Sequence, residues 1–145
     1  MRVLIDTNVL ISAAINPVGT PYRAYTQAVS FPNQGIICDQ NIIELKDVFA
    51  RKFPTKLEAL ERFLSVALLV LELVEVLSRE LGDEKQIRDL DDRPILRAAI
   101  AAKADVLITG DKDFLESGLK KPMIMTPAQF LAEGGKELSI PRLRR

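Results

Sequence analysis

The sequence predicts an α/β fold with a mainly parallel sheet, because short apolar runs alternate with stretches of helical spacing. Its 145 residues are enough for one domain with a hydrophobic core of its own. No internal repeat or break in composition marks a second domain. We therefore expect one domain over residues 1–132 and a mobile tail over residues 133–145, which ends in a basic cluster.

Each predicted strand is a short apolar run, which is typical of a strand buried on both faces of a sheet. The first run leads directly to Asp6, and the fourth leads to Gly110 and Asp111. The third run fits a helix equally well by its spacing. The five runs are Val3–Ile5, Gly35–Cys38, Leu73–Val76, Val106–Thr109 and Met123–Met125.

Helices are predicted where apolar residues recur on one face between these strands. We expect Asp39 to cap the helix after the second strand, and Pro54 and Pro94 to stand near the starts of two others. Residues Pro17–Pro21 and the polar stretch Ser78–Asp92 are predicted loops. The expected helical stretches are Val9–Ala13, Tyr22–Val29, Ile42–Phe49, Leu57–Ala67, Ile95–Ala102 and Pro127–Ala132.

The composition excludes several kinds of chemistry. The chain has no histidine and a single cysteine, Cys38, so it has no Ser-His-Asp triad, no Cys-His dyad and no zinc site of the usual nitrogen and sulfur ligands. Any acid–base or metal chemistry therefore depends on carboxylates. Lys and Arg balance Asp and Glu at 20 each, so no overall basic field indicates a nucleic-acid binder.

The chain also lacks the signs of a membrane or exported protein. The apolar run Val66–Leu71 is too short to span a bilayer, and Asp6 interrupts the apolar start before a signal sequence could form. A lone cysteine cannot form an internal disulfide, which suits a reducing compartment. We expect a soluble, cytoplasmic protein with no membrane contact.

Carboxylates follow two of the predicted strands, at the edge where open parallel sheets bind their ligands. Asp6 follows the first strand directly, and Asp111 follows the fourth. Glu44 lies on a predicted helix, off its apolar face, and the pair Asp91-Asp92 precedes the helix that begins near Pro94. Spacing alone does not bring Asp92 beside Asp111, because a short crossover would leave it at the opposite end of the sheet.

Each of these acids also has a plainer interpretation. Asp92 is an ordinary acid at a helix start, and Asp111 could cap a short helix over residues 112–115. Glu44, taken alone, is most often a solvated helix residue. Asp6-Thr7-Asn8 is the exception, because three polar residues directly after a buried strand usually have a function, although Thr7 or Asn8 could cap the next helix.

Four motifs in order give the chain a resemblance to a known family. Leu4–Ile11 is similar to that family's opening motif, Ile42–Leu45 to its second, Asp91–Ala99 to its third and Val106–Phe114 to its fourth. The motifs cover the chain from Arg2 to about Leu131. As a set, they resemble the PIN-domain nucleases, in particular toxin-like members related to the VapC toxins.

The resemblance implies a fold and a site. The fold would be a three-layer α/β/α sandwich with a mainly parallel central sheet. Asp6, Glu44, Asp92 and Asp111 would converge on Mg²⁺ or Mn²⁺, since in this family the helix after Asp92 faces the acidic pocket. Oxygen ligands suit both ions. The supporting residues would be Asn8, Asp91, Thr109 and Asp113, with Asn8 and Thr109 orienting carboxylates through hydrogen bonds.

The implied function is metal-dependent cleavage of single-stranded RNA, as the toxin of a toxin–antitoxin pair. The implied partners are an antitoxin and a second copy of the chain, for which the helices Tyr22–Val29 and Leu57–Leu71 are candidate surfaces. One alternative is a non-catalytic PIN-like module that binds RNA or protein, but such a module has no reason to retain four acids. The other is an aspartate phosphotransfer or phosphatase-type domain, but Asn8 stands where such a phosphatase needs an Asp.

Overall fold

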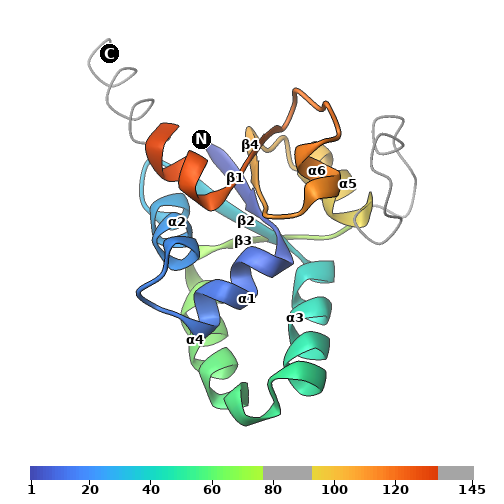
Figure 1. Ribbon diagram of the computed structural model, residues 1–145. Coiled ribbons are helices and arrows are strands. Elements are labelled where there is room, and N and C mark those ends of the chain that lie inside the picture. Colours follow the sequence, from blue (N-terminus) through green and yellow to red (C-terminus); the bar gives the residue numbers. More distant parts are fainter. Residues whose placement is uncertain (77–92, 134–145) are drawn as a thin grey trace.

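The computed structural model describes residues 1–76 and 93–133, and its centre is a five-stranded sheet (Figure 1). All four pairings between neighbouring strands are parallel, and the strand order is β3-β2-β1-β4-β5. The predicted strands are all present, with ends that shift by one or two residues. The strands are β1 (Arg2–Ile5), β2 (Gln34–Cys38), β3 (Glu72–Val74), β4 (Val106–Ile108) and β5 (Met123–Met125).

Helices cover both faces of this sheet. In Figure 1, α5 and α6 lie on one side of the strands, and α1, α2 and α4 lie on the other. Residues 127–133 are also helical and pack beside α2. The helices are α1 (Thr7–Ile15), α2 (Thr20–Val29), α3 (Asp39–Lys52), α4 (Leu57–Val70), α5 (Arg93–Ala101) and α6 (Lys112–Leu115), with a 3-10 turn, η1 (Pro54–Lys56), before α4.

Alternation along the strands divides the core into two layers. Val3 and Ile5 pack against the layer of α1 to α4, whereas Leu4 packs against α5 and α6. The same alternation separates Ile108 from Leu107 on β4. Successive side chains of a strand point to opposite faces, so each apolar run supplies both cores. The predicted three-layer α/β/α sandwich is therefore confirmed.

Three local expectations were wrong. Asp39 does not cap α3: the helix begins at Asp39 itself, and Cys38 is the residue before it. The Asp39 carboxylate instead accepts the backbone N–H groups of Gln40 and Val76. Helix α2 begins at Thr20, inside the predicted loop, because Pro21 fits the first turn of a helix. Leu57 is 42% exposed and does not belong to the buried face of α4.

Other expectations concern residues outside 1–76 and 93–133. The predicted loop Ser78–Asp92 and nearly all of the predicted tail lie there, so the domain boundary at residue 132 stays a prediction. Within the described ranges, no helix has both the length and the apolar character needed to cross a bilayer.

The strand order reverses at β1, and open parallel sheets generally form a crevice at the carboxyl ends of the strands where it does so. From β1 the chain proceeds outward through β2 and β3 on one side, and it then returns to place β4 on the other side of β1. Helix α1 leaves β1 toward one layer, while α6 follows β4 in the opposite layer (Figure 1). Ligands of parallel sheets bind where the connections diverge in this way, which here is between the ends of β1 and β4.

Candidate functional site

Asp6 lies at this crevice, as the residue that joins β1 to α1. Its side chain is only 4% exposed. Its Oδ1 accepts the backbone N–H of Thr7 at 2.8 Å, and its carbonyl accepts the N–H groups of Val9 and Leu10. Asp6 is thus the N-cap of α1, and the cap is neither Thr7 nor Asn8.

A single buried hydroxyl joins Asp6 to the end of the neighbouring strand. Ile5 pairs with Ile108, so the next residues, Asp6 and Thr109, leave the sheet side by side. Thr109 Oγ1 donates to Asp6 Oδ2 at 2.7 Å and accepts the N–H of Asp111 at 3.0 Å. Thr109 has no exposed surface. The hydroxyl therefore fixes the Asp6 carboxylate relative to the loop that bears Asp111.

Asp111 is half-buried and caps the short helix α6. Its Oδ1 accepts the backbone N–H of Asp113 at 2.8 Å, so the capping interpretation of Asp111 is correct. A cap does not exclude a second role, because a carboxylate has about four acceptor positions and this bond occupies one. Asp113 lies in the first turn of α6 and is also half-buried.

Glu44 approaches the crevice from α3, where its side chain is half-buried. Its charge acts on Asp6. The pKa of the Asp6 carboxyl is raised from 3.8 to about 6. Burial is the largest cause, the hydrogen bonds from Thr109 and Thr7 oppose it, and the negative charges of Glu44 and Asp111 add to it. Glu44 and Asp111 thus each lie close enough to Asp6 for their charges to act on its carboxylate.

The donor chemistry at the crevice suits a hard divalent cation. All the candidate ligands are carboxylate oxygens, and a cation would offset the repulsion among them. Within residues 1–76 and 93–133, no three Asp, Glu or Cys side chains form a complete metal-holding group. Asp91 and Asp92 lie outside the described residues.

Sequence reasoning missed Asn41, and it considered Thr7 only as part of the polar cluster after the first strand or as a helix cap. Asn41, which is fully buried on α3, donates from Nδ2 to Thr7 Oγ1 at 2.9 Å. Asn41 did not stand out beforehand, since the contact joins positions that are 34 residues apart. Asn8 is exposed in the first turn of α1, and the hydrogen bonds to the Asp6 carboxylate come from Thr7 and Thr109.

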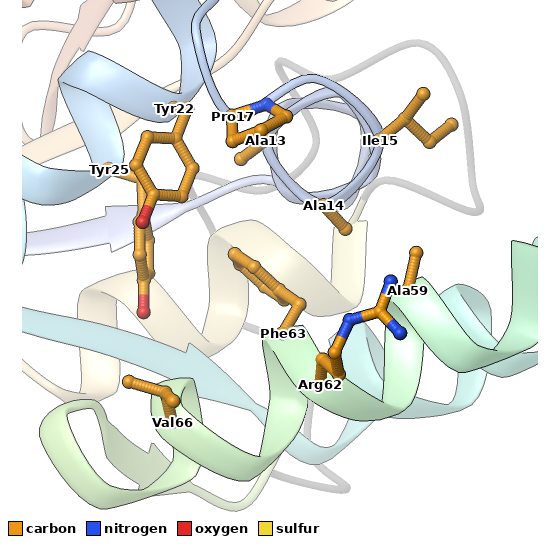
Figure 2. Close-up of a pocket in the computed structure, with 10 residues that line it drawn as sticks. All are labelled: Ala13, Ala14, Ile15, Pro17, Tyr22, Tyr25, Ala59, Arg62, Phe63 and Val66. Carbon is orange, nitrogen blue, oxygen red and sulfur yellow. The ribbon is translucent and has the colours of Figure 1, made fainter.

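An apolar hollow of about 330 Å³ lies at the opposite end of α1 from Asp6. Figure 2 shows the rings of Tyr22, Tyr25 and Phe63 along it, with the Arg62 guanidinium at its edge. Residues from α1, α2 and α4 line it, and no carboxylate is among them. The hollow is therefore a feature separate from the acidic crevice.

Comparisons with known proteins agree on the fold. A family model described as "PIN domain" matches residues 2–113. Uncharacterized protein MJ1680 of Methanocaldococcus jannaschii is 28% identical, over 96% of this chain and 95% of its own length. A chain of the VapBC2 complex of Rickettsia felis, solved with a promoter DNA fragment, superposes with a TM-score of 0.61 at 20% identity, over 81% of this chain and 94% of that one. Mycobacterium tuberculosis VapC20, described as a toxin that cleaves the sarcin-ricin loop, superposes with a TM-score of 0.58 at 14% identity, over 81% and 97%.

Proposed function

Because the chain belongs to the PIN-domain family, whose members are nucleases, we propose that it is a metal-dependent endoribonuclease that cleaves single-stranded RNA. The observation that carries the proposal is the pairing of Asp6 with the Asp111 loop through Thr109, in a crevice that Glu44 also approaches. The similarity to VapC20, which is described as cleaving an RNA loop, supports the choice of substrate.

In this proposal, Asp6, Glu44 and Asp111 would hold Mg²⁺ or Mn²⁺, together with Asp92. When bound, the ion would lower the pKa of a coordinated water and offset the charge that develops on the phosphodiester. Thr109 and Thr7 keep both Asp6 oxygens directed by hydrogen bonds, so the carboxylate need not reorganise during the reaction. With no histidine in the chain, a proton that leaves the attacking water passes to a carboxylate or to solvent.

We also propose that the protein is cytoplasmic and is a toxin with a protein antitoxin as its partner. The VapBC2 neighbour supports this assignment. The apolar hollow between α1, α2 and α4 provides a surface on which an amphipathic segment of the antitoxin could pack. Helix α4 also exposes apolar side chains, with Val66 at 59% and Leu69 at 84%, and these are the candidate contacts of a homodimer.

The decisive experiment is cleavage of an end-labelled single-stranded RNA by the purified protein. We expect cleavage with Mn²⁺ or Mg²⁺, products with 5′-phosphate and 3′-hydroxyl ends, and no cleavage in excess EDTA. Single-stranded DNA of the same sequence tests the choice of substrate. Asp6→Asn should reduce the rate at least ~100-fold, as expected for a group that supports the metal.

A matched control comes from the helix that carries Glu44. Glu44→Gln should lose activity, whereas Asp47→Asn should not, because Asp47 is exposed on the same helix and pairs with Arg51. Cleavage that persists in EDTA would overturn the metal mechanism. Full activity of Asp6→Asn would favour the alternative of a non-catalytic module, with a contaminating nuclease as the source of cleavage.

A further inference from the structure

A buried amide joins the two helices that carry the described acids Asp6 and Glu44. Asn41 lies in the first turn of α3 with no exposed surface. Its Oδ1 accepts the backbone N–H of Cys38 at 2.8 Å, and the Cys38 thiol lies 3.3 Å from the same oxygen. Its Nδ2 donates to Thr7 Oγ1 at 2.9 Å. One side chain thus connects the end of β2, the start of α3 and the start of α1.

Thr7 relays this connection to the Asp6 carboxylate. Its hydroxyl oxygen accepts from Asn41, and its backbone N–H donates to Asp6 Oδ1 at 2.8 Å. Thr7 is buried, so water does not compete for these bonds. The position of Asp6 Oδ1 therefore depends on where Asn41 holds the first turn of α1.

The same amide constrains Glu44. Residues three apart lie on the same side of a helix, so Glu44 lies one turn beyond Asn41 along α3. Fixing the first turn of α3 against the first turn of α1 therefore fixes Glu44 relative to Asp6. Glu44 already acts on Asp6 through its charge, which places the two side chains near each other.

Stability alone is a weak reason for an amide at this position. A satisfied hydrogen bond contributes only about 1 kcal/mol net, and a leucine of similar size would fill the same buried space. An apolar residue would not fix the relative position of the two helix ends as firmly, because packing allows small shifts that the hydrogen bonds of the amide oppose. Sites of this kind lose function when groups move by about 1 Å.

We propose that Asn41 and Thr7 are positioning residues that set the separation of the Asp6 and Glu44 carboxylates for a divalent cation. This inference rests on the proposed function and adds to it two residues that do not touch the ion or the RNA. The link comes from the relay of Asn41 Nδ2, Thr7 Oγ1, Thr7 N–H and Asp6 Oδ1.

The test measures Mn²⁺ binding by calorimetry in the absence of RNA, with thermal melting and the separate values of kcat and KM. Thr7→Val keeps the shape of the side chain but removes the oxygen that accepts from Asn41, and Thr7→Ser restores it. Asn41→Leu removes the amide. Asn33→Leu is the control, because Asn33 is also buried but bonds to the Met1 amino group and to Gln27, at the opposite end of the sheet.

We expect Thr7→Val and Asn41→Leu to weaken Mn²⁺ binding about 10- to 100-fold, the usual effect of losing an outer hydrogen bond at a metal site. Their kcat should fall more than KM changes. Thr7→Ser should bind close to wild type, and Asn33→Leu should melt earlier but bind Mn²⁺ normally. If Asn41→Leu does not fold, Thr7→Val and Thr7→Ser decide the question.

The outcomes separate this inference from the proposed function. Wild-type protein that binds no Mn²⁺ would end the proposed function, and the inference with it. Wild type that binds and cleaves, with Thr7→Val equal to it, would overturn the inference alone and leave Asn41 a structural residue. An equal loss of binding in Asn33→Leu would also overturn it, because general loosening would then explain the effect.

Discussion

Thr109 Oγ1 donates a hydrogen bond of 2.7 Å to Asp6 Oδ2 across the junction of β1 and β4. The same oxygen accepts the N–H of Asp111, so its loss would affect both acids at once. The bond favours the ionised form of Asp6 and lowers its pKa, against the larger effect of burial. These opposing effects lead to predictions for stability, titration and metal binding.

Replacing Thr109 with valine keeps the shape of the side chain and removes its hydroxyl. We expect the pKa of Asp6 to rise and the free energy of unfolding at neutral pH to fall by about 1–3 kcal/mol, because a buried acceptor and the Asp111 N–H lose their partner. Carboxyl NMR titration and urea unfolding measure the two effects. Thr109→Ser, which keeps the hydroxyl, should keep both the pKa of Asp6 and the free energy of unfolding close to wild type. Unchanged values in Thr109→Val would mean that the hydroxyl does not hold the carboxylate.

The metal-free protein should lose stability as the pH rises through the Asp6 titration. The folded state keeps the Asp6 proton up to a pH of about 6, whereas the unfolded chain releases it near 3.8. In this window the folded state binds more protons, so the free energy of unfolding falls with increasing pH, by an amount of about 3 kcal/mol in total. Urea unfolding from pH 4 to pH 7 measures the slope, and subtracting the slope of Asp6→Asn removes the other groups. A difference of zero would contradict the prediction.

Neutralising one acid should leave the metal-free protein as stable as wild type or more stable. Metal should stabilise wild type: at about 100 times its dissociation constant, Mn²⁺ should add roughly 2.7 kcal/mol to the free energy of unfolding, or several degrees in melting temperature. Asp6→Asn and Asp111→Asn should gain much less. Thermal melts with and without Mn²⁺ test this directly. An equal shift in all three proteins would show that the acids do not share a site.

The adjacent acids Asp91 and Asp92 should differ in importance. Asp92 matches the third motif of the family best, so we expect Asp92→Asn to reduce RNA cleavage at least ~100-fold. Asp91→Asn should reduce the rate of RNA cleavage clearly less. Both are assayed at the same Mn²⁺ concentration and in the same preparation series. If Asp91→Asn has the greater effect, the assignment of this motif is displaced by one residue.

The alternation of strands and helices could be predicted because it depends on local patterns. Runs such as Val106–Ile108 are apolar throughout, and such runs form strands when both faces are covered. The placement of Asp6 and Asp111 at one edge also follows from the pattern, since Asp6 directly follows β1 and Asp111 lies in the loop after β4, a neighbouring strand of the same parallel sheet.

The hydrogen bonds within the site could not be predicted in this way. Asn41 looks like any polar residue in a helix until the fold brings it to Thr7. Asp39 looks like a helix cap, but its carboxylate accepts a hydrogen bond from the backbone N–H of Val76, which is distant in the sequence and lies just after β3. In both cases a tertiary partner decides the role of the side chain, and no local signal identifies that partner.

The pairing of β1 with β4 has a consequence for the order in which the protein is made. Val3 pairs with Val106, so the place of β4 beside β1 stays unfilled while the intervening chain is synthesised. Closing so long a loop comes late in folding. A nascent chain that ends before Thr109 contains Asp6 but neither Thr109 nor Asp111. If the protein cleaves RNA as proposed, the ribosome that translates it therefore has no assembled site beside it until most of the chain has been made.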